Sequence, residues 1–286
     1  MKILVIGGSG FLGKKLIDNL SQQANELYGA VRNIPSITNQ DCNYILVDDL
    51  DKGSSISPLI FDVIINVAMK RSLRCLPVSD EVMWELNFEN PLSIIRKYSN
   101  ESTLVINTST YIQNHKGVKG QTVETYSATK ELLSTALKSD ADSDLYRVLD
   151  LYLFTLYGPG DRESHLVPLL LSAIRTGSLV SLSEGNQLMN LLYVDDAVDS
   201  IVASTHSNDK GYHAYQLWEQ NYFSVRDLVL IIERTFSSKL NVEWGAIPYG
   251  GHEMFEPWPT LFPVYPLFIP KVGLKEGLKL SSDFNT

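Results

Sequence analysis

Cysteine and paired histidines are scarce in this sequence. Its 286 residues contain two cysteines, Cys42 and Cys75, and none of the five histidines has a second one at the H-x-x-x-H spacing of a metal site. This argues against a disulfide framework and predicts that no metal is bound. The apolar runs are too short to span a membrane, and the first, residues 3–6, is too short for a signal sequence. We therefore expect a soluble protein of the reducing cytoplasm.

The sequence also has fewer basic than acidic residues. Lysine and arginine together number 24 against 33 aspartates and glutamates, which gives a net charge of -9 with no basic run. This balance argues against binding to nucleic acid or to an anionic membrane, although a local positive pocket can still hold a phosphate. The sequence does have 44% hydrophobic residues, enough to bury the core of one large domain or of two lobes.

The clearest motif stands at the beginning of the sequence. Residues 3–6 are a short apolar run typical of a buried parallel strand, and Gly7, Gly10 and Gly13 follow in a G-x-x-G-x-x-G spacing. From residue 11 the apolar residues recur at helical spacing. A glycine turn before a helix N-terminus presents backbone N–H groups to an anion, and glycine lets a pyrophosphate approach closely. We predict a dinucleotide site at Gly7, Ser9, Gly10, Phe11, Leu12 and Gly13.

The next predicted strand ends in a basic residue. Residues 27–31 read as a strand, and Arg32 follows where dinucleotide folds often carry an acid that binds the adenosine ribose. An arginine at this position suits a 2′-phosphate instead. Arg32 therefore favours NADP(H) over NAD(H) as the cofactor; the alternative interpretation is a solvated surface arginine.

Strands and helices continue to alternate along the sequence. Residues 44–47 and 62–67 read as strands, and residues 79–98 as a long helix that Pro91 kinks or splits. This alternation predicts an α/β fold with a Rossmann-like, doubly wound parallel sheet, in which the carboxyl ends of the strands face the ligand. The further cofactor-binding residues expected from these segments are Asp48, Asp49, Leu50, Ala68 and Asn87.

Residues that suit proton transfer follow a fifth predicted strand, residues 103–109. The strand end carries Thr108, Ser109 and Thr110, and Tyr126 and Lys130 open a later helix. Residues four apart share a helix face, so both side chains can point into one cleft. A nearby ammonium lowers the pKa of a phenol, ordinarily about 10. With a hydroxyl, the pair can protonate a carbonyl oxygen as a nicotinamide delivers hydride. Taken alone, the pair also fits a helix start with a surface lysine.

In order and spacing, these features resemble the short-chain dehydrogenase/reductases. Residues 151–174, with their Y-G-P-G sequence, and residues 179–202, with a glycine loop and V-D-D, are similar to the extended branch, the NAD-dependent epimerase/dehydratase type. Within that branch the sequence is most similar to nucleotide-sugar 4-ketoreductases. Three pieces support this: Asn107-Thr108, residues 157–161 and residues 244–257.

The resemblance implies a reaction and a role for each site residue. The reaction is NADPH-dependent reduction of the 4-keto group of a nucleotide-linked 4-keto-6-deoxy sugar, in deoxysugar biosynthesis for a surface polysaccharide such as lipopolysaccharide. By position, Tyr126 is the acid and Lys130 its electrostatic partner, and both also bind the cofactor. Thr108 polarises the carbonyl, with Ser109 as the alternative. The implied substrate-binding residues are Thr110, Thr155, Arg162 and Gln187.

The resemblance also implies how the chain is divided. A Rossmann domain would span residues 1–154, with residues 187–206 returning to it, and a smaller substrate-binding lobe would take most of residues 155–286. The branch often dimerises through a four-helix interface, so a homodimer is an arrangement that the resemblance allows. Near the carboxyl terminus, residues 224–236 have helical spacing with a serine N-cap, whereas the prolines of residues 257–270 exclude a continuous helix.

Departures from the family pattern leave alternatives open. Met189 stands where the branch usually has an arginine that grips the substrate diphosphate, and Tyr152 stands where another arginine is usual. Arg162, Arg175 and Lys119 are the candidates to replace the first, and the sequence does not choose between them. A nucleotide-sugar 4-epimerase and a non-catalytic NADP-binding sensor remain as other functions. A dehydratase is disfavoured, because residues 108–110 are T-S-T instead of the T-D-E of that group.

Overall fold

The computed structural model describes residues 1–23, 26–52, 59–72, 77–114, 124–218, 221–250 and 253–283; Cys75 and Lys119 lie outside them. Contacts divide the chain into two units. Unit 1 comprises Met1–Leu153, Val198–Gln216 and Leu261–Leu267, and unit 2 comprises Phe154–Ala197, Leu217–Thr260 and Phe268–Thr286. Each unit has its own hydrophobic core.

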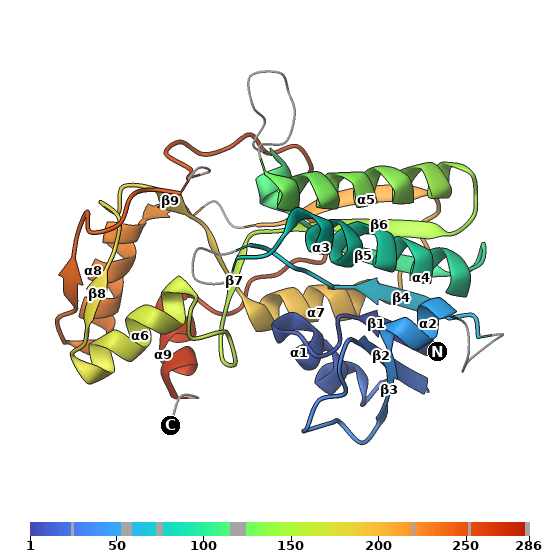
Figure 1. Cartoon of the computed structure of the whole chain (residues 1–286), viewed down its shortest axis with the longest axis horizontal. Coiled ribbons are helices and arrows are strands. Elements are labelled where there is room, and N and C mark those ends of the chain that lie inside the picture. The colour runs from blue at the N-terminus through green and yellow to red at the C-terminus, as the bar shows by residue number, and fades with distance from the viewer. Residues whose placement is uncertain are drawn as a thin grey trace. The chain divides into compact units, whose positions relative to one another are not determined.

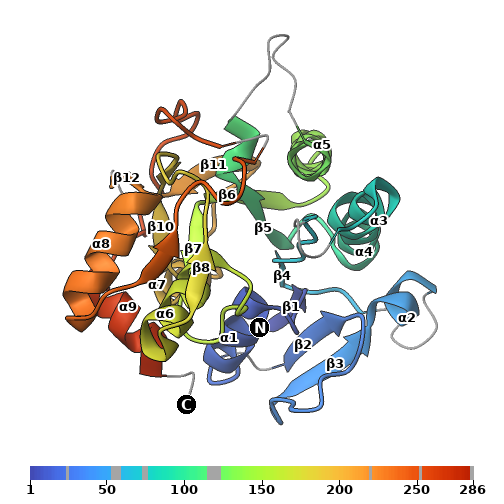
Figure 2. The same cartoon turned by 60° about the vertical axis from the view of Figure 1, so that its left-hand side comes forward.

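A seven-stranded sheet forms the centre of unit 1. Its strands are β1 (Lys2–Ile6), β2 (Glu26–Val31), β3 (Cys42–Leu46), β4 (Val63–Asn66), β5 (Leu104–Thr110), β6 (Arg147–Leu153) and β11 (Tyr212–Leu217). The spatial order is β11-β6-β5-β4-β1-β2-β3, and β1 to β6 pair in parallel (Figure 2). The predicted Rossmann-like, doubly wound α/β fold is confirmed. From β1 the chain adds β2 and β3 on one side, and it then returns to add β4, β5 and β6 on the other. A ligand crevice is expected where the strand order changes in this way, between β1 and β4.

Helices cover both faces of this sheet. Those of unit 1 are α1 (Phe11–Leu20), α2 (Val47–Lys52), α3 (Asp80–Trp84), the π-helical turn η1 (Glu85–Glu89), α4 (Asn90–Tyr98), the 3₁₀ turn η2 (Tyr111–Asn114), α5 (Thr125–Asp142) and, from Val198 on, α7 (Val194–Ser204). Figures 1 and 2 show α2 to α5 on one face and α1 and α7 on the other. On the first face, Ile64 and Val105 of the strands pack in one core with Leu92 of α4 and Leu133 of α5.

The local sequence explains where these elements begin and end. The predicted helix of residues 79–98 consists of α3, η1 and α4, with Pro91 in the first turn of α4, where proline needs no N–H partner. Ser79 caps α3 by accepting a hydrogen bond from the backbone N–H of Val82. The third strand ends one residue earlier than predicted, because Val47 already starts α2. Sequence reasoning predicted neither β6 nor β11 as a strand.

In its described residues, unit 2 combines short strands with three helices and the first turn of α7. Its core joins Leu171, Leu228 and Leu278 from the three helices. Ser224 caps α8 in a capping box with Asp227, so the predicted N-cap is confirmed. Among the residues described, no helix is long and apolar enough to cross a membrane. The elements are β7 (Thr155–Tyr157), α6 (Leu166–Thr176), β8 (Leu179–Ser181), β9 (Leu188–Met189), β10 (Leu191–Tyr193), β12 (Phe223–Ser224), α8 (Val225–Phe236), β13 (Asn241–Glu243) and α9 (Leu274–Asp283), with the strands paired β7-β10, β8-β13 and β9-β12.

Candidate active site

The glycine turn lies where the sheet order reverses. Gly7 follows β1 with a φ of +91°, and a Cβ on it would lie 2.8 Å from the backbone nitrogen of Ala68, which follows β4. A Cβ on Gly13 would lie 2.2 Å from the carbonyl oxygen of Gly7. Gly10 is the N-cap of α1 and makes no side-chain capping bond, so the first N–H groups of the helix stay available to an anion. These features fit the diphosphate of a dinucleotide cofactor.

The remaining residues of the turn differ in exposure. Ser9 is exposed and Phe11 half-buried, so both have surface to offer a ligand. Leu12 is 8% exposed and its side chain belongs to the core. The predicted contact of Leu12 with the cofactor would therefore be made by its backbone groups and not by its side chain.

The residues predicted to bind the adenosine half follow β2 and β3. Arg32 comes directly after β2 and is exposed, as is Asp48 in the first turn of α2; Asp49 is half-buried. Leu50 differs, because its side chain is fully buried and its carbonyl accepts hydrogen bonds from the Tyr98 hydroxyl and the Lys97 amine. The carbonyl of Leu50 therefore holds the end of α4. The side chains of Arg32, Asp48 and Asp49, by contrast, can contact a ligand.

Asn87 positions the segment after β4. It is fully buried in η1, and π-helical turns of this kind are frequent at functional sites. Its carboxamide accepts from the N–H of Lys70 at 2.7 Å and donates to the carbonyl of Lys70 at 2.7 Å and to the Thr129 hydroxyl at 3.2 Å. The side chain predicted to bind the cofactor thus holds the backbone between Ala68 and Arg71 in place.

Lys130 is 2% exposed and its ammonium is held by backbone carbonyls. Its Nζ donates to the carbonyl of Ala68 at 3.0 Å and to that of Thr108 at 2.9 Å. Burial lowers the pKa of Lys130 to about 8, and the charge of Asp150 acts in the opposite direction. Lys130 therefore lies between the ends of β4 and β5, beside the glycine turn.

Tyr126 lies in the first turn of α5 and is 7% exposed. Its pKa is raised to about 12, because burial outweighs the opposing effects of Arg71 and of a hydrogen bond from the Thr110 side chain. The guanidinium carbon of Arg71 lies 5.5 Å from the centre of the Tyr126 ring, and Arg71 forms an ion pair with Glu124 at 3.2 Å. The cation acting on Tyr126 is thus Arg71, which no sequence motif had indicated, in place of the predicted Lys130.

The two hydroxyls predicted as catalytic point elsewhere. The Thr108 hydroxyl donates to the carbonyl of Asn66 at 2.9 Å. The Ser109 hydroxyl donates to Asp150 at 2.7 Å and lies 2.8 Å from that of Ser134, within a buried polar cluster. Alternate residues of a strand face opposite sides, so Thr110 shares a side with Thr108 and not with Ser109. In this structure Thr110 is the hydroxyl hydrogen-bonded to Tyr126.

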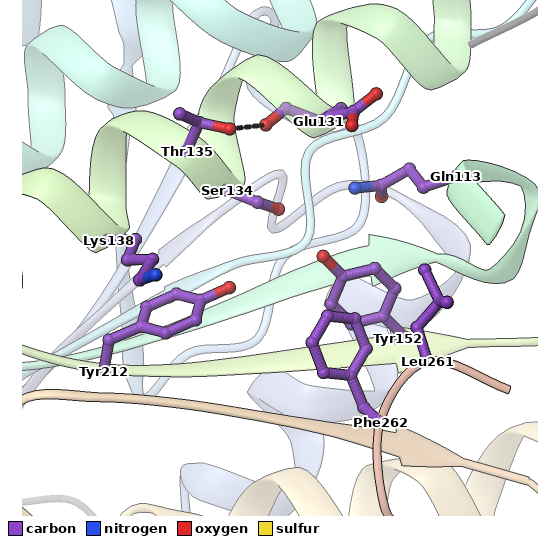
Figure 3. Close-up of a pocket in the computed structure, with 9 residues that line it drawn as sticks. All are labelled: Gln113, Glu131, Ser134, Thr135, Lys138, Tyr152, Tyr212, Leu261 and Phe262. Carbon is purple, nitrogen blue, oxygen red and sulfur yellow. Dashed lines mark hydrogen bonds between the residues drawn. The ribbon is translucent and has the colours of Figure 1, made fainter. Parts of the chain in front are cut away.

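A pocket of about 260 Å³ lies next to this cluster in unit 1 (Figure 3). Gln113 of η2 holds the strand end, because its carboxamide oxygen accepts from the N–H of Thr110 at 2.9 Å. Figure 3 shows its nitrogen directed toward Ser134 and Tyr152. Buried as it is, this nitrogen finds no hydrogen-bond partner among the residues that the structure describes. The lining residues are Gln113, Glu131, Ser134, Thr135, Lys138, Tyr152, Tyr212, Leu261 and Phe262.

The residues predicted to bind substrate, apart from Thr110, belong to unit 2. Thr155 starts β7 and is half-buried, and Arg162 is exposed in the turn before α6. Gln187 is half-buried, and its carboxamide forms hydrogen bonds with the Ser183 hydroxyl. Met189, in the place of the usual arginine, pairs in the sheet with Phe223. Of these residues, Arg162 is the exposed one.

The family comparison covers the glycine turn, the Tyr126–Lys130 pair and the first elements of unit 2. The model described as NAD dependent epimerase/dehydratase family matches residues 3–217. The chain belongs to this family. The prediction of an NAD(P)-dependent enzyme from the extended branch is confirmed.

Similar proteins match over almost the whole chain. The CDP-abequose synthase of Yersinia pseudotuberculosis is 24% identical over 270 residues, 90% of this chain and 92% of that protein. The enzyme of the same name from Salmonella typhimurium is 22% identical over 88% of this chain and 87% of that protein.

Among solved structures, MoeE5 in complex with UDP-glucuronic acid and NAD superimposes with a TM-score of 0.81 at 18% identity, over 99% of this chain and 98% of that one. The UDP-glucose 4-epimerase of Thermotoga maritima with UDP-glucose superimposes with a TM-score of 0.82 at 17% identity, with the same two coverages. These likenesses show the fold.

Proposed function

We propose that the protein reduces the 4-keto group of a nucleotide-linked 4-keto-6-deoxy sugar with NADPH. The observation that carries this proposal is Tyr126, a buried phenol hydrogen-bonded by Thr110 and flanked by the Arg71 cation. Two relatives named CDP-abequose synthase, each matched over at least 87% of its length, support the ketoreductase reaction over others in the family. Deoxysugar synthesis for a surface polysaccharide, in the cytoplasm, is the setting that we propose.

Each residue near the glycine turn has a task in this reaction. The backbone of Gly7, Gly10 and the first turn of α1 would hold the cofactor diphosphate, and Lys130 would meet its ribose beside Ala68. When bound, the nicotinamide supplies the hydride. Tyr126 donates its proton to the ketone oxygen, and Arg71 stabilises the phenolate left behind. Thr110 orients the phenol by its hydrogen bond, a different task from the polarisation of the carbonyl that was expected of Thr108 or Ser109.

The other expectations complete this proposal. The exposed Arg32 at the end of β2 would bind the 2′-phosphate of NADPH, since no acid stands there. Unit 1 would serve as the cofactor domain and unit 2 as the substrate-binding lobe, with Thr155, Arg162 and Gln187 contacting the nucleotide sugar. A homodimer through α4 and α5 fits the family.

A nucleotide-sugar 4-epimerase is the second candidate. Several of the structurally similar proteins are named as 4-epimerases, and one was solved with UDP-glucose. An epimerase returns the hydride to the sugar, so it keeps its cofactor oxidised between turnovers. Tightly bound NAD in the purified protein would therefore favour an epimerase, whereas a reductase must release NADP and take up NADPH.

The test is NADPH oxidation by the pure protein with CDP-, GDP- and dTDP-linked 4-keto-6-deoxy sugars, with NADH in parallel. Oxidation with one of them, faster with NADPH, is the expected result. Tyr126→Phe should then lose at least about 100-fold in kcat while NADPH affinity stays within about twofold, because the phenol oxygen is the proton donor. Absence of oxidation with every sugar contradicts the proposal.

A further inference from the structure

A carboxylate that the proposed reaction does not use lies close to Lys130. Asp150 is in the middle of β6 and fully buried. Its Oδ1 accepts from the amide of Asn107 at 2.8 Å and from the hydroxyl of Ser109 at 2.7 Å, and its Oδ2 from the hydroxyl of Tyr212 at 2.9 Å. Burial raises the pKa of Asp150, and the hydrogen bonds that it accepts act in the opposite direction, because they stabilise its charged form. A buried charge calls for a counter-charge.

A continuous series of hydrogen bonds connects Asp150 to the ammonium of Lys130. Asn107, bonded to Asp150, accepts from the amide of Asn66 at 2.8 Å. Asn66 in turn accepts from the N–H of Ala68 at 3.2 Å with its side chain, and from the Thr108 hydroxyl at 2.9 Å with its backbone carbonyl. The carbonyls of Ala68 and Thr108 are the two groups that hold Lys130.

These bonds fix both acceptors of the lysine. Ala68 is placed by the side chain of Asn66, and Thr108 by its own hydroxyl on the backbone of the same residue. All of these groups lie at the ends of the adjacent strands β4 and β5. These contacts give Asp150 two routes to Lys130: through the position of the two carbonyls and through its charge.

We propose that Asp150 is a positioning residue that keeps Lys130 charged and in place through Asn107 and Asn66. The proposal deepens the proposed function and rests on it, because Lys130 matters there as a ribose ligand beside the proton donor. Among the residues that the structure describes, the titratable groups around the pair are Tyr152 and Tyr212 next to Asp150, Tyr126 on the same helix as Lys130, and Glu131, whose charge acts on Tyr152.

Tyr212, at the pocket, provides a control for a change at Asp150. Ser134, Tyr152 and Tyr212 line the pocket (Figure 3), and the Tyr212 hydroxyl bonds Asp150 from that side. Tyr212→Phe removes one donor while leaving the carboxylate and the series of bonds to Lys130 intact. It is therefore the matched control for the loss of the charge in Asp150→Asn.

The experiment measures the titration of Lys130 in the full chain by NMR of ¹³C-labelled lysine, with the signal assigned by its loss in Lys130→Arg. With Asp150 present the midpoint should lie near 8. Asp150→Asn should lower it by roughly one to two units, because burial then acts without the counter-charge, and Tyr212→Phe should move it by less than about 0.5. An unchanged midpoint in folded Asp150→Asn overturns the proposal.

A second measurement does not depend on the variant folding. In the unaltered protein, ¹³C-labelled aspartate reports the charge of the Asp150 carboxyl. Ionisation at pH 7 is the expected result, and a protonated Asp150 at that pH overturns the proposal. Neither titration needs a substrate, so failure of the ketoreductase assay and failure of the Asp150 assignment are seen separately. In the assay, Asp150→Asn should also shift the pH profile of NADPH affinity, which Tyr212→Phe should leave in place.

Discussion

The pKa of the buried Tyr126 phenol depends on its neighbours as well as on burial. Its pKa is raised to about 12 with these neighbours in place, because burial has the largest effect. Arg71 and the Thr110 hydrogen bond act in the opposite direction, and Glu124 holds Arg71 by an ion pair. Asn87 fixes the backbone just before Arg71 through Lys70. The arginine is therefore anchored from both sides.

Replacing Arg71 should weaken Tyr126 as an acid. In Arg71→Met the phenol loses its cation, so its pKa rises further and kcat for ketone reduction should fall about tenfold, with NADPH affinity within about twofold. For the reverse oxidation, which needs the phenolate, the rise of rate with pH should move to higher pH. Lys97→Met is the control, because Lys97 lies 5.8 Å from the ring centre of Tyr98, outside the site. Equal pH profiles for the two variants would contradict this role.

The residue types of the site were predictable, and their orientation was not. Strand periodicity places Thr108 and Thr110 on one side of β5 and Ser109 on the other, but the sequence does not say which side meets α5. Arg71 belongs to no motif, because it follows β4 in an irregular segment. Sequence patterns did not predict a role for Asp150 either, because a single acidic residue between apolar ones indicates a break in a strand and belongs to no motif.

At the scale of elements, the connection from β1 to α1 sets the most demanding packing of unit 1. The carbonyl of Gly7 lies where a Cβ of Gly13 would be, and the main chain of Ala68 lies where a Cβ of Gly7 would be. Three segments thus meet without side chains between them. The close approach leaves backbone N–H groups, and no methyl group, facing the proposed cofactor diphosphate.

Gly13→Ala should therefore lose cofactor binding and stability together. The added methyl would lie 2.2 Å from the Gly7 carbonyl, so β1 and α1 must separate, at a cost of about 2 kcal/mol or more in unfolding free energy. NADPH affinity by fluorescence titration should fall at least about tenfold. In Gly273→Ala the methyl meets no atom within 4 Å, and NADPH affinity should stay unchanged. A Gly13→Ala protein that binds NADPH normally would show that the turn tolerates a side chain.

Elements with strong periodicity were recovered from sequence, and those with mixed composition were not. The strands β1, β2, β4 and β5 and the helices α1, α5 and α8 occur where the pattern predicted them, to within a few residues. β11 carries a histidine, two tyrosines and a glutamine, and joins the sheet only through tertiary contact with β6. Its pairing depends on a partner distant in sequence, which local patterns do not reveal.

At the scale of the whole molecule, the buried Lys130 makes stability depend on pH. Its pKa is about 8 in the folded protein, below the ordinary value of 10.5. Between these values the unfolded chain holds a proton that the folded protein has released, so the unfolding free energy should rise with pH by about 1.4 kcal/mol per unit. Above about pH 10 the raised pKa of Tyr126 acts in the opposite sense, because only the unfolded phenol loses its proton.

Urea unfolding at intervals from pH 7.5 to 9.5 measures this slope. The unaltered protein should gain stability relative to Lys130→Met across that interval, since methionine fills the same space without a titrating group. Lys138→Met, which removes an exposed lysine of the same helix, serves as the comparison. Parallel stability curves for the unaltered protein and Lys130→Met would show that Lys130 titrates alike in the folded and unfolded states.

Unit 1 is discontinuous in sequence, and this matters for a chain that is made from one end. A nascent protein emerges from the ribosome with β6 complete at residue 153, but β11, which pairs with it, begins only at residue 212. The backbone bridge from Gln216 to Val264 and the hydrogen bond from Ser204 to Tyr265 come later still. During synthesis the edge of β6 therefore stays open while unit 2 is being made, which exposes an unpaired strand to other nascent chains.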